Sequence, residues 1–449
     1  MISGEDALRA GVDFQLQEGE IVFTSRLAEG DYNIRYYQDI NNPGRIVNQP
    51  LSDGFFSYLD ARPGAYFYYP VADSNETVIS KQNILINNRG YHQIQFLDFS
   101  ASPNWARDAI IYLLYVRKFS GEGTINGVIG QLDYLKTLGV SCLWLMPVME
   151  SSTPNGYAPT DFFSIEKDYG TLQDYQHLIQ ELHKRDMRII FDFIANHTSN
   201  QHPFFISSWR NPNSPFRDWY VWKSDKEYAF HNTWDQLPNF NYNNPNVRNY
   251  ILKAAKLWID QGIDGLRCDV AWAVPHNFWK DFRRRVKAWN PQLLLIDEVL
   301  PGQPAYHDQE FDMSYDSDFY GGLLDYFKGN LPLPGLIFRI KKHHLNYPPQ
   351  AQALRYLETQ DLPRFIKQFG KEKTRLATAL LLTLPGTPLI YYGQETGLSE
   401  QRPPMKFNRQ QNKYFRFYRK LIGLRRDNPE LRSQSLEFLE NSAPEKVLT

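Results

Sequence analysis

From residue 109 onward, short apolar runs alternate with amphipathic stretches, and this alternation constrains the fold more than any other feature of the sequence. The apolar runs are typical of buried strands, and the stretches between them carry apolar residues at helical spacing. We expect strands at 110–116, 141–148, 188–194, 266–270, 293–299, 313–315, 353–359 and 388–392. Strands that alternate with helices form a parallel sheet. Eight of them predict a closed (β/α)8 TIM barrel, and an open doubly wound sheet is the alternative.

Helices are expected between these strands, at 124–138, 172–186, 247–261, 276–289, 336–344, 373–384 and 414–426. The glycine-rich phosphate loops that are typical of open doubly wound sheets do not occur in the sequence. Their absence favours the closed barrel.

The first 103 residues have a different sequence pattern. Short runs rich in Tyr, Phe, Ile and Val are separated by turn clusters, such as the Asn-Asn-Pro-Gly run at 41–44. This spacing predicts a small antiparallel β-sandwich at 1–103. The catalytic barrel would then occupy 104–435, with a short inserted domain after its third strand at about 198–246 and a tail at 436–449.

Composition and charge argue against several classes of protein. The formal net charge is −1 and no long basic run occurs, so we do not expect nucleic acid as a partner. No apolar run is long enough to span a membrane, and the first residues do not resemble a signal peptide, so we expect a cytoplasmic protein. The two cysteines, Cys142 and Cys268, lie in apolar runs and are expected to be buried free thiols.

Charged side chains gather where the predicted strands end. Asp192 lies in the third strand, Arg267 and Asp269 in the fourth and Glu298 in the fifth, while Asp361 follows the seventh. In a barrel, the loops after the strands form the active face. Residues two apart in a strand share one side, so Arg267 would lie beside Asp269 and favour its ionised form. Two carboxylates that flank one bond are the minimum for glycoside hydrolysis, although an Arg-x-Asp pair alone is also consistent with a structural ion pair.

These strand ends resemble the sequence motifs of the α-amylase superfamily, which is family 13 of the glycoside hydrolases. The first two motifs are similar to Asp-x-x-x-Asn-His at 192–197 and to Gly-x-Arg-x-Asp at 265–269. Glu298 matches the third motif, and Asp361 with Arg364 matches the fourth. Further similar segments lie at 139–147, 156–163, 237–241 and 386–395. The resemblance covers about residues 105–435 and implies the same barrel fold.

The resemblance implies catalytic roles for three carboxylates. Asp269 would be the nucleophile, which forms a covalent glycosyl-enzyme with net retention of configuration. Glu298 would be the general acid and then the base. Asp361 would form hydrogen bonds with sugar hydroxyls in subsite −1 and help to distort the ring.

The resemblance also implies a set of substrate-binding residues: Tyr157, Asp192, His197, Arg267, Gln360 and Arg364. Arg267 would hold Asp269 ionised, and His197 would donate a hydrogen bond to a sugar hydroxyl. Tyr157 would stack beneath the sugar ring, and Asp192 would bind nearby or orient Arg267. Structural roles stay open for Asp192 as a strand-end cap and for Tyr157 as a core residue.

The sequence departs from the family pattern in three places. Gln360 stands where the family has His, and a Gln amide can donate a hydrogen bond but cannot become cationic. The Lys-His pair that usually follows the nucleophile is replaced by the run 270–273, so acceptor preference differs, and Trp272 or His231 could contact sugar instead. We also expect the β-sandwich that usually follows the barrel to be absent.

Metal binding is a weaker expectation. Many relatives bind calcium between the barrel and the inserted domain, where Asn196 would be one ligand. Asp218, Asp225 and Asp235 are scattered along the insertion and do not form a cluster. We therefore expect no required cofactor and no catalytic metal, and calcium stays an open alternative.

These observations predict a retaining hydrolase of α-glucosidic bonds, with starch, glycogen, maltodextrins or maltooligosaccharides as the substrate. An α-glucan transglycosylase is one alternative. A catalytically impaired glucan-binding protein with the same fold is another, because Gln360 replaces a transition-state contact. The intact set of Arg267, Asp269, Glu298 and Asp361 argues against the binding protein.

Overall fold

The computed structural model describes residues 102–439 apart from 231–232, 308, 348–350, 408–411 and 434–435, with the backbone alone at 304 and 343–346. Before residue 100 it describes the backbone of the strands. The chain divides into two compact units. One comprises residues 1–99 with 344–348, and the other comprises residues 100–343 with 349–449.

The first unit contains two antiparallel sheets. One sheet pairs β1 (Val12–Gln17), β2 (Glu20–Ser25) and β5 (Phe55–Tyr58). The other has the order β4 (Ile46–Pro50), β3 (Tyr32–Tyr37), β6 (Gly64–Ala72), β8 (Gln82–Ile86) and β9 (His92–Gln95), and β7 (Thr77–Val78) pairs with β6. The antiparallel pairing agrees with the β-rich region that the turn spacing predicts, and the boundary at 103 stays a prediction.

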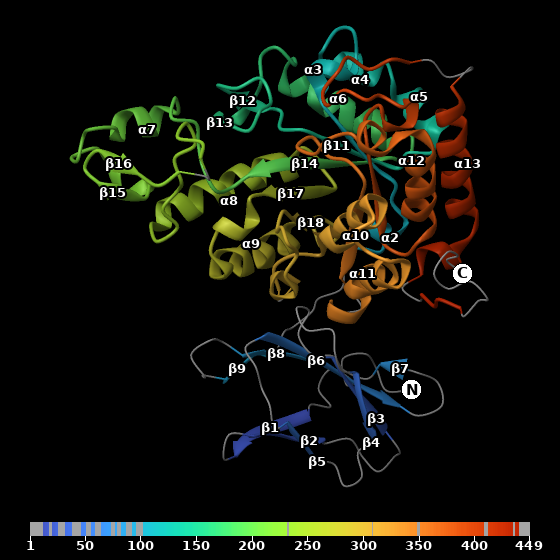
Figure 1. Cartoon of the computed structure of the whole chain (residues 1–449). Helices are drawn as coiled ribbons and strands as arrows, with labels where there is room; N and C mark the ends of the chain where they lie inside the picture. The colour runs from blue at the N-terminus through green and yellow to red at the C-terminus, as the bar shows by residue number, and fades with distance from the viewer. Residues whose placement is uncertain are drawn as a thin grey trace. The chain divides into compact units, whose positions relative to one another are not determined.

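A closed barrel of eight strands forms the centre of the second unit, and Figure 1 shows it among its helices. The strands are β10 (Ile111–Leu114), β11 (Cys142–Leu145), β14 (Arg188–Ile194), β17 (Gly265–Asp269), β18 (Leu294–Asp297), β19 (Met313–Tyr315), β20 (Gln352–Tyr356) and β21 (Thr387–Tyr391). Neighbouring strands pair in parallel, and Ile111 lies opposite Leu389 where the last strand closes onto the first. The predicted TIM barrel is confirmed, and the open sheet is wrong.

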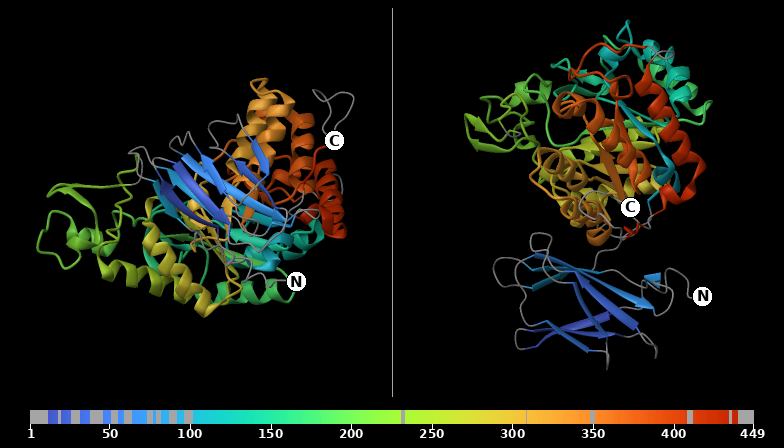
Figure 2. Two further views of the ribbon diagram at one scale, coloured as in Figure 1. Left: turned by 90° about the horizontal axis from the view of Figure 1, so that it is seen from below. Right: turned by 45° about the vertical axis from the view of Figure 1, so that its right-hand side comes forward.

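Helices cover the outside of the barrel, as both views in Figure 2 show. They include α4 (Ile125–Ile129), α5 (Leu132–Leu138), α6 (Leu172–His183), α8 (Pro245–Asp260), α9 (His276–Trp289), α10 (Ser317–Lys328), α11 (Leu333–Asn346), α12 (Phe365–Thr383) and α13 (Lys413–Asp427). The helix expected at 124–138 is instead two helices, with Gly130 as the C-cap of the first. The sequence prediction missed α10, because two adjacent glycines, Gly321 and Gly322, weaken its helical pattern.

Local sequence signals fix several of these ends. Thr171 begins α6 with a capping box, in which its side chain and that of Asp174 each accept a backbone N–H. Asn244 caps α8 by accepting the backbone N–H of Asn246 with its side chain, and Pro245 lies in the first turn. Gly139 ends α5 with φ of +102°, and a Cβ at this position would lie 2.6 Å from Ile422. Only glycine fits both the left-handed backbone and the close packing there.

Two segments extend beyond the barrel. A hairpin of β12 (Met149–Ser151) and β13 (Pro159–Ile165) follows β11. The insertion after β14 contains α7 (Pro203–Ser208), the short helix η1 (Arg217–Trp219), β15 (Trp222–Ser224) and β16 (Glu227–Tyr228). It projects from one side of the barrel (Figures 1 and 2) and is held together by stacked rings, such as those of Phe205 and Trp222. The insertion expected after the third strand is therefore confirmed.

The described helices include none that is long and apolar enough to cross a bilayer. The short helix α2 (Asn104–Asp108) precedes the first barrel strand. In the predicted tail, residues 440–449 lie outside the described part of the chain.

Candidate active site

The predicted site residues lie at the carboxyl ends of the barrel strands. Asp192 in β14 pairs with Arg267 in β17, and Asp269 is the last residue of β17. Glu298 directly follows β18, and Asp361 lies in the loop after β20. Because parallel strands end at the same edge, these polar residues from four strands meet at one opening of the barrel.

Arg267 is the centre of the cluster. Its guanidinium is fully buried, and Nη1 donates to Oδ1 of Asp192 and to Oδ1 of Asp269, at 2.7 Å each. Nη2 lies 2.6 Å from Oε1 of Glu298, in an ion pair that does not have hydrogen-bond alignment. Three carboxylates therefore surround one cation. The expected pairing of Arg267 with Asp269 is present in this geometry.

Burial and charge act in opposite directions on Asp269. Burial raises the pKa of the Asp269 carboxyl well above its usual range, and Arg267 offsets only part of this rise. The neighbouring Glu298 and Asp192 raise the pKa further. The expectation that Arg267 favours the ionised form of Asp269 is correct in direction, but burial and the neighbouring carboxylates together outweigh the effect of Arg267 on this pKa.

The residue after the nucleophile candidate has an unusual backbone. Val270 adopts φ of +47° and ψ of +43°, in the left-handed region. A β-branched residue rarely occupies this region, and the cost is on the order of 1–3 kcal/mol. The conformation directs the Val270 N–H to Oε2 of Glu298 at 2.8 Å. One backbone amide thereby fixes the carboxylate of the general-acid candidate.

An open cleft of about 290 Å³ lies above this cluster. Among its lining residues are the expected Asp269, Glu298, Asp361, Tyr157 and His197. Arg267 and Asp192 lie beneath it, fully or almost fully buried. The structure therefore brings the three carboxylates together at one cavity.

A chain of hydrogen bonds fixes the Tyr157 side chain. Its hydroxyl donates to Oδ2 of Asp192 at 2.9 Å and accepts from Nε2 of Gln360 at 2.9 Å. Nε2 of His197 donates to the Tyr157 carbonyl at 2.9 Å, since a carbonyl can only accept. Gln360 is almost fully buried and does not line the cleft. Its amide orients Tyr157, and His197 supports the same residue from its backbone.

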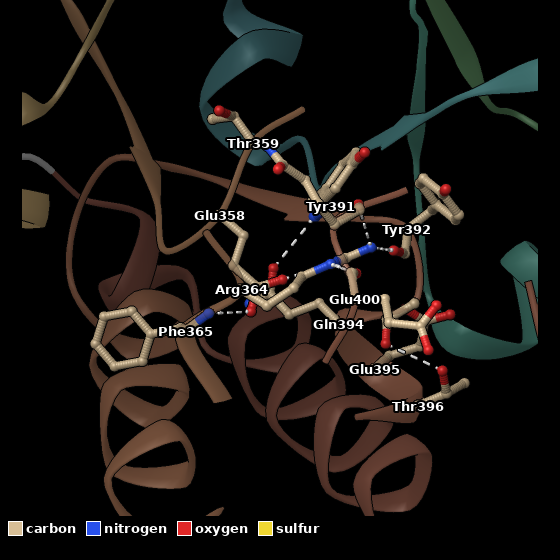
Figure 3. A network of polar contacts seen from close by, with 12 residues as sticks. Glu358, Thr359, Arg364, Phe365, Tyr391, Tyr392, Gln394, Glu395, Thr396 and Glu400 are labelled. Carbon is tan, nitrogen blue, oxygen red and sulfur yellow. Dashed lines mark hydrogen bonds and ion pairs between the residues drawn. The ribbon is translucent and has the colours of Figure 1, made fainter. Parts of the chain in front are cut away.

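Arg364 lies away from the cleft, in the buried network that Figure 3 shows. Its Nη1 donates to Glu358 at 2.9 Å, and Nε and Nη2 donate at 2.8 Å to the carbonyls of Glu400 and Tyr392. Arg364 is the N-cap residue of α12, where the chain turns away from the opening. Arg364 is therefore not at the cleft, although it lies only three residues after Asp361 in the sequence. Its contacts support the loop after β21.

Sequence analysis missed several residues that line the cleft, among them Trp234, Gln236 and Arg402. Nη2 of Arg402 lies 3.2 Å from Oδ1 of Asp361. All three residues come from irregular loops, where no periodic pattern marks a side chain as inward-facing. Trp272 is half exposed and is not among the cleft residues, and His231 lies outside the described part of the chain.

The described residues do not fit a metal site. In this part of the chain, no three His, Cys, Asp or Glu side chains gather in a way that could hold an ion. Asn196 is the residue that the resemblance implies as a calcium ligand, and its Nδ2 donates to Oδ1 of Asn239 at 3.1 Å. We therefore derive no catalytic step that involves a metal.

A (β/α)8 barrel that places several carboxylates around one guanidinium at an open cleft has the groups that a glycoside hydrolase needs. The family model described as "Alpha amylase, catalytic domain" matches residues 72–414. The chain belongs to this alpha-amylase family, as the motifs predict.

Individual relatives agree with this assignment. The "Alpha-amylase MalA" of Haloarcula japonica is 36% identical over 335 residues, which are 74% of this chain and 50% of that protein. The chain thus spans half the length of this curated relative. A solved cyclomaltodextrinase matches 94% of this chain and 83% of its own, with 25% identity and a TM-score of 0.75. The solved structure of the cyclic α-maltosyl-(1→6)-maltose hydrolase of Arthrobacter globiformis, in complex with that sugar, covers 74% of this chain and 85% of its own. The sequence identity is 26% and the TM-score is 0.71.

Proposed function

We propose that the chain is a retaining glycoside hydrolase that cleaves α-glucosidic bonds of starch, glycogen or maltodextrins. The arrangement of Asp269 and Glu298 around the Arg267 guanidinium carries this proposal, because both carboxylates line the cleft. The relatives, named as an alpha-amylase, a cyclomaltodextrinase and a maltosyl-maltose hydrolase, support an α-glucan as the substrate class.

The proposed reaction has two displacements. In the first, the Asp269 carboxylate attacks the anomeric carbon, the glycosidic bond breaks, and Glu298 gives its proton to the leaving oxygen. In the second, the Glu298 carboxylate takes a proton from water, the oxygen of that water attacks the same carbon, and Asp269 is released.

Other groups would hold the sugar. Asp361, on the cleft wall beside Arg402, would bind sugar hydroxyls, and the ring of Tyr157 would provide the surface beneath the sugar. We assign Gln360 and Arg364 to positioning, since Gln360 contacts Tyr157 and Arg364 contacts the loop that leads to Arg402.

Product analysis tests the proposal. Wild-type protein and Asp269→Asn are incubated with maltoheptaose and with soluble starch, and the anomeric form of the first products is read by proton NMR. We expect short α-anomeric maltooligosaccharides from the wild type and a loss of at least about 10⁴-fold in the variant. Longer products would favour transfer to sugar. Starch binding without any product would favour the glucan-binding protein and contradict the proposal.

A further inference from the structure

A second groove lies on the outer face of the catalytic unit, between the insertion and helices α8 and α9. Its volume is about 480 Å³, and its lining residues differ completely from those of the active-site cleft. We call it the α8 groove. Trp219 comes from η1, and Trp289 is the last residue of α9. Figure 1 shows α8 and α9 side by side in the outer ring.

The floor of the α8 groove is one face of α8. Asn246, Asn249, Lys253 and Lys256 line the groove and recur at intervals of three, four and three residues, and Tyr250 lies next to Asn249. This spacing places them along a single stripe. At the helical rise per residue, the stripe is about 15 Å long. The groove is therefore elongated and suits a chain-like ligand.

Aromatic rings line the α8 groove together with amide groups. The Trp219 ring is held edge-on by Phe204 and Tyr250, with centroids 4.9 and 5.4 Å away. Trp289 is 37% exposed, although large apolar side chains are usually covered. Aromatic faces pack on the apolar faces of sugar rings, and side-chain amides bind hydroxyls.

The charges around the α8 groove favour a neutral ligand. No Asp or Glu lines it, and its cations are Lys253, Lys256 and Arg285. Lys256 is paired with Asp260 at 2.5 Å and Arg285 with Asp281 at 2.9 Å. Lys256 is thereby neutralised, and Arg285 is partly compensated because it shares Asp281 with Arg284, whereas a site for phosphate or another polyanion needs unpaired cations.

From this combination of rings, amides and compensated charge, we propose that the α8 groove binds an α-glucan chain outside the active-site cleft. The identity of the sugar rests on the proposed function. Binding there would raise the local concentration of a long substrate near the cleft, and it would not affect short substrates that occupy the cleft alone.

The test compares Trp289→Ala with wild type on soluble starch and on maltotriose. We expect the KM for starch to rise about 3- to 10-fold, because the variant loses one aromatic contact with the sugar. We expect kcat and all constants for maltotriose to stay within about twofold of wild type, because Trp289 does not line the cleft. Trp289→Tyr, which keeps a ring, should restore most of the affinity for starch.

The control is Phe417→Ala in α13, outside the groove. Phe417 is partly buried, and the Arg375 guanidinium lies 4.8 Å from the centre of its ring. This variant should leave starch kinetics unchanged. Migration in starch-containing gels gives a second measure, with Glu298→Gln compared against Glu298→Gln/Trp289→Ala. Unchanged starch affinity in both assays would overturn the α8 groove proposal, while absence of hydrolysis by wild type would contradict the proposed function alone.

Discussion

At the scale of single residues, the site depends on one guanidinium that serves three carboxylates. Nη1 of Arg267 binds both Asp192 and Asp269, and Nη2 pairs with Glu298. A planar guanidinium can contact several acceptors in fixed directions, and an ammonium cannot reproduce this fork. Arg267 therefore fixes the positions of these groups and favours the ionised form of Asp269.

Arg267→Lys should reduce kcat/KM by about 10²- to 10³-fold. Burial raises the pKa of Asp269 and Arg267 lowers it, so weakening the pairing raises this pKa further. Because the nucleophile must be ionised, the acid limb of the pH profile should move to higher pH. The profile of kcat/KM against pH on maltoheptaose checks both effects. Arg283→Lys, at another buried pair with Asp312, should leave the limb in place, and an unmoved limb in Arg267→Lys would contradict the argument.

Gln360 acts through Tyr157. Gln360→Leu removes the amide that donates to the Tyr157 hydroxyl, and one such hydrogen bond is worth about 1 kcal/mol. We therefore expect a fall of about fivefold in kcat/KM on maltoheptaose, mainly through KM. Gln176→Leu breaks a similar amide pair with Gln261 far from the cleft and should not change the kinetics. Equal kinetics in Gln360→Leu and wild type would show that Tyr157 needs no such support.

At the scale of elements, the buried network of Figure 3 ties the start of α12 to the loop after β21. Arg364 contacts the carbonyls of Glu400 and Gln401, and the next residue is Arg402, which pairs with Asp361. The cleft wall thus depends on an arginine that is itself absent from the cleft.

Arg364→Met leaves Glu358 buried without its cation, so the free energy of unfolding should fall by about 3–5 kcal/mol. The loosened loop should also lower kcat/KM for maltoheptaose. Arg355→Met breaks another buried pair, with Asp316, and should cost similar stability with a smaller loss of activity. Urea unfolding and initial rates measure the two effects. Equal activity in both variants would contradict the role of the loop.

Strands and strand-end residues were predictable from sequence, whereas convergence of loops was not. Buried strands such as β14 and β18 are recognisable as apolar runs, and the motifs place Asp269 at the end of β17 and Glu298 directly after β18. Trp234 and Arg402 reach the cleft because the long irregular loops that carry them fold back over it, and no periodic sequence pattern predicts such a path. Arg364 was misplaced because a helix begins at this residue and turns its side chain inward.

At the scale of the whole molecule, a buried carboxyl next to the general-acid candidate couples stability to pH. Asp297 is fully buried and accepts a hydrogen bond from Ser314, and burial raises its pKa to about 8. The folded protein therefore keeps a proton that the unfolded chain loses near pH 4. Its contribution to stability is largest at low pH and is lost as the pH rises to about 8.

Asp297→Asn removes this titration. The free energy of unfolding of wild type minus that of the variant should fall steadily between about pH 4 and pH 8. Urea unfolding at several pH values measures this difference. A constant difference across the range would mean that Asp297 is ionised in the folded protein.

Activity should be independent of calcium. The described residues offer no cluster of three acidic, His or Cys side chains that could hold an ion. We expect EDTA to leave the rate on maltoheptaose unchanged within about twofold. A loss of rate that added calcium restores would contradict this expectation.

The insertion leaves the barrel and returns to it at neighbouring backbone positions. The N–H of Thr198 donates to the Pro238 carbonyl at 3.2 Å, and the N–H of Phe240 donates to the Asn196 carbonyl at 2.9 Å. The insertion is therefore attached to the barrel by two backbone ends that lie next to each other. The entropic cost of closing a loop between such ends changes slowly with the length of the loop. The segment between them can be exchanged as a cassette. Since it carries Trp234 into the cleft and Trp219 into the α8 groove, one such exchange would alter the preferences of both sites while the scaffold stays intact.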